Sequence, residues 1–226
     1  MTAALPQSPS ARPRPGPPEP VNRRHHHPLR VVHSTAPVDL GAAERAAAAF
    51  LAALGVDVAT ENRRDTPGRM ARAYAEMFTP RPFDLTTFPN DDGYDEMVLA
   101  RAIPVQSVCE HHLLPFVGVA HVGYLPGDRI LGLSKLARVV ELFARQPQVQ
   151  ERLTQQVADW LQTTLEPRGV GVVIEAEHLC MTMRGVHADG VTTVTSAVQG
   201  HLRQDAAARA EFFALALPRP TNRRRP

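Results

Sequence analysis

The segment Phe116-Val117-Gly118-Val119-Ala120-His121-Val122-Gly123-Tyr124 decides the fold, because β-branched and aromatic residues concentrate in it as they do in strands. Two helical patterns follow it, and turn residues such as Pro126-Gly127-Asp128 separate the elements. The order strand, strand, helix, helix, strand, strand predicts an α+β domain with two helices on one face of an antiparallel four-stranded sheet. Further strand-like runs cover residues 103–108, 129–131, 170–176 and 192–198.

Both helical patterns carry apolar residues at helical spacing. The first is predicted to begin at Ser134 as its N-cap and to end before Pro147. The second spans about residues 149–165 and ends at Pro167-Arg168-Gly169. Their buried faces are expected to carry Leu136, Val139, Val140 and Phe143 in the first helix, and Leu153, Val157, Trp160 and Leu161 in the second.

Two more helices are predicted ahead of the sheet. One begins at Asp39, a suitable N-cap, and ends at Gly55. The other has Pro67 in its first turn and stops before Pro80. The helix that begins near Pro67 is expected to bury one face, made of Met70, Tyr74, Met77 and Phe78.

Composition divides the 226 residues into three parts. Residues 1–37 are rich in Pro and Arg and predict a disordered arm. Residues 38–217 have the size of one catalytic domain, and residues 218–226 form a basic tail. The net charge of +2 comes largely from the two ends and predicts no nucleic-acid partner. No membrane span or secretory pattern is found, so we expect a cytoplasmic protein with reduced thiols.

The motif Cys109-Glu110-His111-His112 predicts a metal site. Cys109 and His112 have the spacing of a ligand pair, and the only other cysteine, Cys180, can supply a third ligand. Thiolate and imidazole ligands favour Zn²⁺, and three protein ligands leave an open catalytic position. His111 and His178 are candidates for proton transfer beside the metal. Two alternatives are a disulfide between the cysteines and a buried, purely structural Cys180.

Basic residues on the helix that begins near Ser134 can bind an anion. Lys135 and Arg138 can point from its first turn in a similar direction, and Arg184 can add a third cation near the metal. Solvated surface charges are the alternative. Glu151 can accept two hydrogen bonds from the N–H and NH₂ edge of guanine, or simply favour the helix dipole at a first turn.

Several motifs in order resemble the GTP cyclohydrolase I family, and the resemblance covers residues 39–215. They are Cys109-Glu110-His111-His112, Gly132-Leu133-Ser134-Lys135-Leu136, Gln148-Val149-Gln150-Glu151-Arg152-Leu153-Thr154, Glu177-His178-Leu179-Cys180-Met181 and Met183-Arg184-Gly185. The resemblance implies conversion of GTP and water to 7,8-dihydroneopterin triphosphate and formate, the first step of folate or tetrahydropterin biosynthesis. It also implies a tunnelling fold (T-fold) in a toroidal homodecamer of two pentamers, with active sites at subunit interfaces.

The resemblance also implies a role for each site residue. Zinc would be held by the two cysteines and His112, and His111 and His178 would shuttle protons. Glu151 and Gln150 would bind guanine, with Ser134 close to the ribose. The triphosphate would be bound by Lys135, Arg138, Arg184 and, from a neighbouring subunit, Arg69.

Two other classes of enzyme with the same fold are alternatives to this assignment. Related nitrile reductases use a cysteine as a nucleophile, and tetrahydropterin synthases bind zinc through three histidines, so neither pattern matches Cys109, His112 and Cys180. A non-catalytic paralogue that binds nucleotide or a regulatory partner is the third alternative. Such a protein has no need for unliganded imidazoles beside an open metal.

Overall fold

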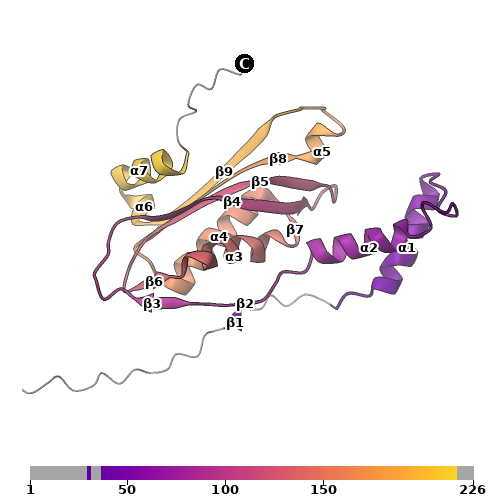
Figure 1. Ribbon diagram of the computed structural model, residues 1–226. Helices are drawn as coiled ribbons and strands as arrows, with labels where there is room; N and C mark the ends of the chain where they lie inside the picture. Colours follow the sequence, from indigo (N-terminus) through magenta and orange to yellow (C-terminus); the bar gives the residue numbers. More distant parts are fainter. Residues whose placement is uncertain (1–29, 32–36, 218–226) are drawn as a thin grey trace, which may run out of the picture.

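A five-stranded sheet forms the centre of the fold (Figure 1). Its order is β7 (Pro147–Gln148), β4 (Val98–Cys109), β5 (Pro115–Leu125), β8 (Gly169–His178) and β9 (Thr192–Gly200). The predicted four antiparallel strands are present as β4, β5, β8 and β9. The short β7 adds a fifth strand, parallel to β4, so the sheet is mixed. The computed structural model describes residues 30–31 and 37–217.

Helices α3 (Leu133–Ala144) and α4 (Gln150–Leu165) cover one face of the sheet, as predicted (Figure 1). Their apolar residues are buried against the strands, except that Phe143 and Trp160 are only half-buried. The predicted N-cap at Ser134 is wrong, because α3 starts two residues earlier than that cap implies and Gly132 is its N-cap. This places Ser134 within the first turn, exposed to solvent.

Two helices that were not predicted, α6 (His201–Gln204) and α7 (Ala206–Ala216), pack on the other face of the sheet (Figure 1). Asp205 is the N-cap of α7 and accepts a hydrogen bond from the Ala208 amide at 2.7 Å. The fully buried Phe212 lies over Gly123 and Gly171, where the missing side chains leave room for its ring. The alanine-rich sequence of α7 has a weak amphipathic pattern, which is why it escaped prediction.

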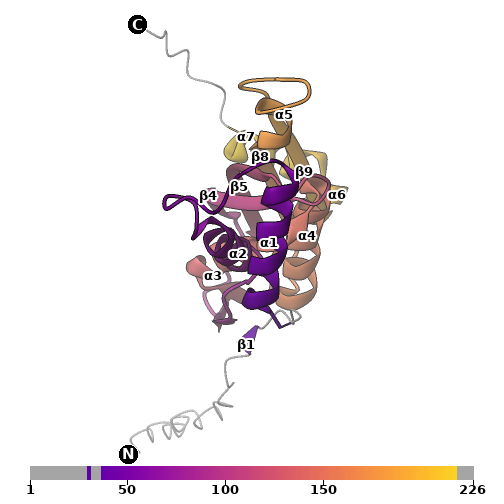
Figure 2. The same cartoon turned by 90° about the vertical axis from the view of Figure 1, so that its right-hand side faces the viewer.

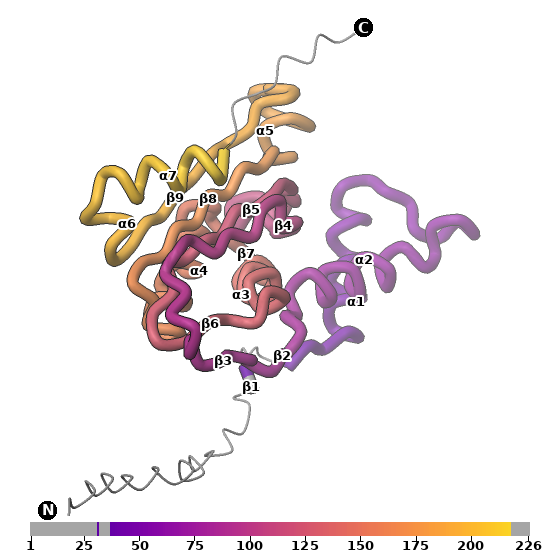
Figure 3. Tube along the Cα trace, turned by 60° about the vertical axis from the view of Figure 1, so that its left-hand side comes forward, coloured from indigo at the N-terminus to yellow at the C-terminus, as the bar shows by residue number. Residues whose placement is uncertain are grey.

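The N-terminal helices α1 (Leu40–Ala53) and α2 (Thr66–Met77) form a hairpin that projects from the body of the domain (Figure 3). In Figure 2, which looks from that side, they stand in front of the sheet. Asp39 caps α1 as predicted, through a 2.9 Å hydrogen bond from Ala42. The predicted buried face of α2 is only half-buried: its residues are Met70, Tyr74 and Met77, with Phe78 just beyond the helix.

Short strands complete the fold. β6 (Arg129–Leu131) is a strand as predicted, but it pairs with β3 (Thr87–Pro89) outside the central sheet. β1 (Arg30–Val31) pairs with β2 (Phe83–Asp84), so these two residues are ordered where the disordered arm was predicted. The rest of that arm, apart from residue 37, and the tail at 218–226 lie outside the described residues. Within the described part of the chain, no helix is long and apolar enough to cross a membrane.

Candidate metal centre and active site

Three ligand atoms, one each from Cys109, His112 and Cys180, converge at one end of the sheet. Cys109 is the last residue of β4, and His112 lies in the turn that leads to β5. Cys180 lies in α5 (Leu179–Thr182), which follows β8 directly. Because β5 pairs with both β4 and β8, the strand ends meet, and the three atoms lie within 4.8 Å of one another. The predicted ligand set is therefore brought together by the fold.

The spacing of these atoms suits a small tetrahedral ion. Bonds of about 2.0–2.3 Å hold the ligands of tetrahedral zinc roughly 3.5 Å apart. Cys109 Sγ and His112 Nδ1 are 3.9 Å apart, close to that separation. Both cysteines are free thiols, so the disulfide alternative is not realised. Burial, and next the nearby Cys109, raise the pKa of the Cys180 thiol, so metal binding must displace its proton.

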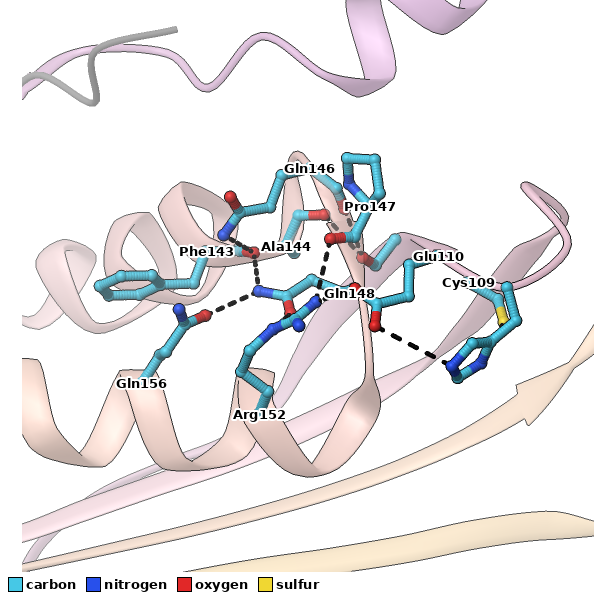
Figure 4. Close-up of polar contacts among 11 residues, drawn as sticks. Cys109, Glu110, Phe143, Ala144, Gln146, Pro147, Gln148, Arg152 and Gln156 are labelled. Carbon is cyan, nitrogen blue, oxygen red and sulfur yellow. Dashed lines mark hydrogen bonds and ion pairs between the residues drawn. The ribbon is translucent and has the colours of Figure 1, made fainter.

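His111 lies beside the metal ligands and is 66% exposed. Its Nδ1 is 3.8 Å from Cys109 Sγ, and its Nε2 is 3.9 Å from Glu110 Oε1. Glu110 in turn forms an ion pair with Arg152 of α4 (Figure 4). The hydrogen bond from Arg152 lowers the pKa of Glu110, which keeps the carboxylate charged beside the imidazole.

Arg152 is held in turn by Gln148. Its Nε donates to Gln148 Oε1 at 2.9 Å, while Gln148 Nε2 donates to Phe143 O at 2.8 Å and to Gln156 Oε1 (Figure 4). Gln148 is fully buried, so it holds Arg152 in place, and Arg152 in turn holds Glu110 of the metal turn. Sequence reasoning missed this network, although Glu110 lies inside the metal motif and Arg152 is one helical turn from Gln148.

His178, the second predicted proton-transfer residue, is the last residue of β8. Its ring stacks on Phe116, its partner in the β5–β8 register, with centroids 4.6 Å apart. Its Nε2 lies 2.8 Å from the side-chain oxygen of Gln150. Burial lowers the pKa of His178, although the nearby Glu151 carboxylate acts in the opposite direction.

The predicted substrate residues divide into two groups. Glu151 is exposed in the first turn of α4, next to the buried Gln150 and close to His178, and Arg184 follows α5 close to Cys180. Ser134 and Lys135 are at the other end of the sheet. Leu131, just ahead of them, donates to the Tyr124 hydroxyl at 2.9 Å. Tyr124 is eight residues along β5 from the metal end, which corresponds to about 26 Å of strand.

Each of the two remaining arginines lies beside an acidic residue close to it in the sequence. Arg138 Nη1 is 3.1 Å from Glu141 Oε2 on α3. Arg69, on α2, lies 3.4 Å from Asp65 and is well exposed. A cavity of about 440 Å³ between α2, α3, β4 and β5 is lined by Arg81, Glu141 and Arg145, but by no metal ligand. Of the residues predicted to bind the triphosphate, Arg184 therefore stands near the metal ligands of the same chain, whereas Lys135 lies at the other end of the sheet.

The α+β domain carries a group of two cysteines and one histidine that leaves a fourth metal position open, and two further imidazoles lie beside it. This arrangement is typical of a metal-dependent enzyme. The family model of GTP cyclohydrolase I matches residues 43–217. This chain belongs to the GTP cyclohydrolase I family, as its motifs predicted.

Curated relatives agree with this assignment. GTP cyclohydrolase 1 of Mycolicibacterium vanbaalenii is 52% identical over 202 residues, which cover 87% of this chain and 99% of the relative. That of Streptomyces avermitilis is 57% identical over 78% of this chain and 90% of its own length. That of Thermobifida fusca is 54% identical over 80% of this chain and 90% of its own length. The similarity extends well beyond the metal motifs.

Proposed function

We propose that this protein converts GTP and water to 7,8-dihydroneopterin triphosphate and formate, the first step of folate or tetrahydropterin biosynthesis. The observation that carries the proposal is the convergence of Cys109, His112 and Cys180 within 4.8 Å, in a chain of this family. Two thiol ligands need a reducing compartment, which supports placing the enzyme in the cytoplasm.

The metal ligands and the histidines would divide the chemistry between them. Zinc, when bound by Cys109, His112 and Cys180, would supply a Lewis acid that activates water for attack on C8 of the purine. His178 exchanges protons with N7 as the imidazole ring opens, and a second hydration releases formate. His111, oriented by the charged Glu110, serves the later proton transfers of ribose opening and pterin closure.

Glu151 is proposed to select the base. Its exposed carboxylate stands in the first turn of α4, next to the residue that contacts His178. Two carboxylate oxygens match the paired N–H and NH₂ donors of guanine, whereas adenine lacks this pair. A guanine held there would present its imidazole ring to the metal side of the site.

The triphosphate is proposed to lie between subunits. Arg184 stands near the metal ligands in the same chain, but Ser134 and Lys135 are at the far end of the sheet, and Arg138 is paired with Glu141. A neighbouring copy can supply these residues and Arg69 if its sheet continues from an open edge of this one. The edge strand β9 and the exposed Met183, Val186 and Val194 offer such a surface. This supports a toroidal homodecamer of tunnelling-fold subunits.

The test is a zinc-loaded assay that follows formate and the oxidised, fluorescent pterin in parallel, with ATP as the control substrate. Equal amounts of formate and pterin from GTP alone are expected. Glu151→Gln should raise KM for GTP by about 10- to 100-fold, because one acceptor becomes a donor. Glu166→Gln, an exposed change at the other end of α4, is the matched control. Absence of product from an assembled, zinc-loaded protein would overturn the proposal.

A further inference from the structure

Gln150 has a buried side chain whose every polar atom is bonded inside the protein. The residue is 2% exposed, and its side-chain amide is surrounded by protein groups. Its Nε2 lies 3.1 Å from the carbonyl oxygen of Ile174 and 2.9 Å from that of Thr193. Carbonyl oxygens only accept hydrogen bonds, so these two contacts require the NH₂ group on that side of the amide.

Two threonines fix the same orientation independently. Thr154 Oγ1 donates to the Gln150 main-chain oxygen at 2.8 Å, which uses its only proton. Thr195 Oγ1, 2.7 Å from Thr154 Oγ1, must therefore be the donor in that contact. Its oxygen then has only lone pairs to turn towards Gln150 Nε2, 3.1 Å away, so a donor is again required there and one NH₂ hydrogen is shared between two of the three acceptors. The side-chain oxygen of Gln150 must consequently point the other way, towards His178.

This orientation determines which nitrogen of His178 carries the proton. Gln150 Oε1 can only accept, so the His178 Nε2 that lies 2.8 Å away must carry the hydrogen. In the neutral ring the lone pair is then on Nδ1. None of the hydrogen bonds among the described residues uses Nδ1, and it is not one of their buried unpartnered atoms, so solvent can reach it. Stacking on the fully buried Phe116 holds the ring plane.

We propose that Gln150 is a positioning residue that locks His178 in the Nε2–H tautomer, so that His178 enters the reaction as a proton acceptor through Nδ1. The inference rests on the proposed function and refines it. As the oxygen of water bonds to C8, one of its protons passes to Nδ1, and the same proton is then delivered to N7. Water is thereby added across the C8–N7 bond, and the imidazole is returned neutral.

The tautomer can be observed directly by magic-angle-spinning ¹⁵N spectra of histidine-labelled, zinc-loaded protein, with the His178→Ala spectrum subtracted to isolate His178. We expect a protonated Nε2 and an unprotonated Nδ1 in the wild type. In Gln150→Leu the signal should change to a mixture of tautomers. kcat should fall by about 10²-fold, while KM for GTP and the zinc content stay within about threefold.

Gln148→Leu is the matched control, because Gln148, the last residue of β7 just ahead of α4, is equally buried but donates to Phe143 and Gln156 rather than contacting His178. It should keep the wild-type His178 signal whatever it does to stability. Thr195→Val, at a half-buried edge-strand position, is a milder variant should Gln150→Leu fail to fold. It should produce part of the same tautomer change.

A wild-type signal with the proton on Nδ1, or an unchanged His178 signal in both Gln150→Leu and Thr195→Val, would overturn the proposal. The same change in Gln148→Leu would reduce it to a general packing effect and overturn it as well. Failure of the wild type to turn over GTP would instead remove the proposed function, and the tautomer spectra would still decide whether Gln150 positions the ring.

Discussion

At the residue scale, Cys180 is the ligand that only the tertiary fold brings to the metal. Cys109 and His112 share one turn, but Cys180 arrives from α5 through the pairing of β5 with β8. Two ligands from one turn bind zinc weakly, because Cys180 is the third ligand and its thiolate, the second in the site, neutralises more of the charge of Zn²⁺. The metal content of the protein should therefore depend on this single side chain.

We expect Cys180→Ala to lower the zinc content from about one ion per chain to less than about 0.1, and GTP turnover with it. Elemental analysis after dialysis against a weak chelator measures the first quantity. His187→Ala, an exposed histidine in the segment after α5, is the control and should keep its zinc. Full zinc retention in Cys180→Ala would show that another residue completes the site.

At the scale of elements, the Phe212 ring of α7 packs over two glycines of the sheet. A Cβ on Gly171 would lie 2.6 Å from Phe212 Cζ and 2.7 Å from two more ring atoms. The ring is fully buried and cannot move aside without lifting α7 from β5 and β8. A methyl group at this position therefore tests whether α7 depends on that contact.

Gly171→Ala should lower the free energy of unfolding by about 1–3 kcal/mol, the usual effect of overpacking a core. Urea unfolding followed by circular dichroism measures the change. Gly41→Ala is the control, because its new methyl group meets only ordinary contacts on the exposed side of α1 and should stabilise that helix slightly. Replacing Phe212 by Leu in the Gly171→Ala protein should recover part of the lost free energy of unfolding. A double variant less stable than both Gly171→Ala and Phe212→Leu would contradict the contact.

At the scale of the whole molecule, Glu141 joins the N-terminal hairpin to the body. Its carboxylate accepts from Arg138 and Arg145 on and after α3, and from Arg81 beyond α2, while Arg145 also donates to Glu76 O at 2.7 Å. Burial would raise the pKa of Glu141, but Arg81 and the two other guanidinium groups together hold it below its usual value. The ion pairs of Glu141 with the three arginines are therefore stronger when its carboxylate is charged.

Glu141→Gln should lower the free energy of unfolding at pH 7 by about 1–3 kcal/mol, between the values for exposed and buried ion pairs. Because the folded pKa lies below the unfolded one, the wild type keeps this advantage above about pH 4.3 and loses it as the pH falls through the folded pKa. Urea midpoints measured from pH 7 downwards should converge for the two proteins. Glu211→Gln on the exposed side of α7 should show no such convergence.

Much of the fold could be predicted because its signals are local. The caps and breakers Asp39, Gly55 and Pro147 bound helices where they were expected, and the apolar spacing of α3 and α4 gave their buried faces. The start of α3 and the helix α7 were missed, since a glycine N-cap and an alanine-rich helix carry weak local patterns. β7 was missed because two residues show no period.

The sequence by itself determined the metal-ligand types, the two spare imidazoles and the family, because these depend on which residues are present and on their order. Only the tertiary structure decided that Cys180 meets Cys109, that Gln150 faces His178, and that Lys135 stands at the far end of the sheet. These are contacts between residues distant in the chain. Strand pairing and register create them, and no local pattern of residues encodes either.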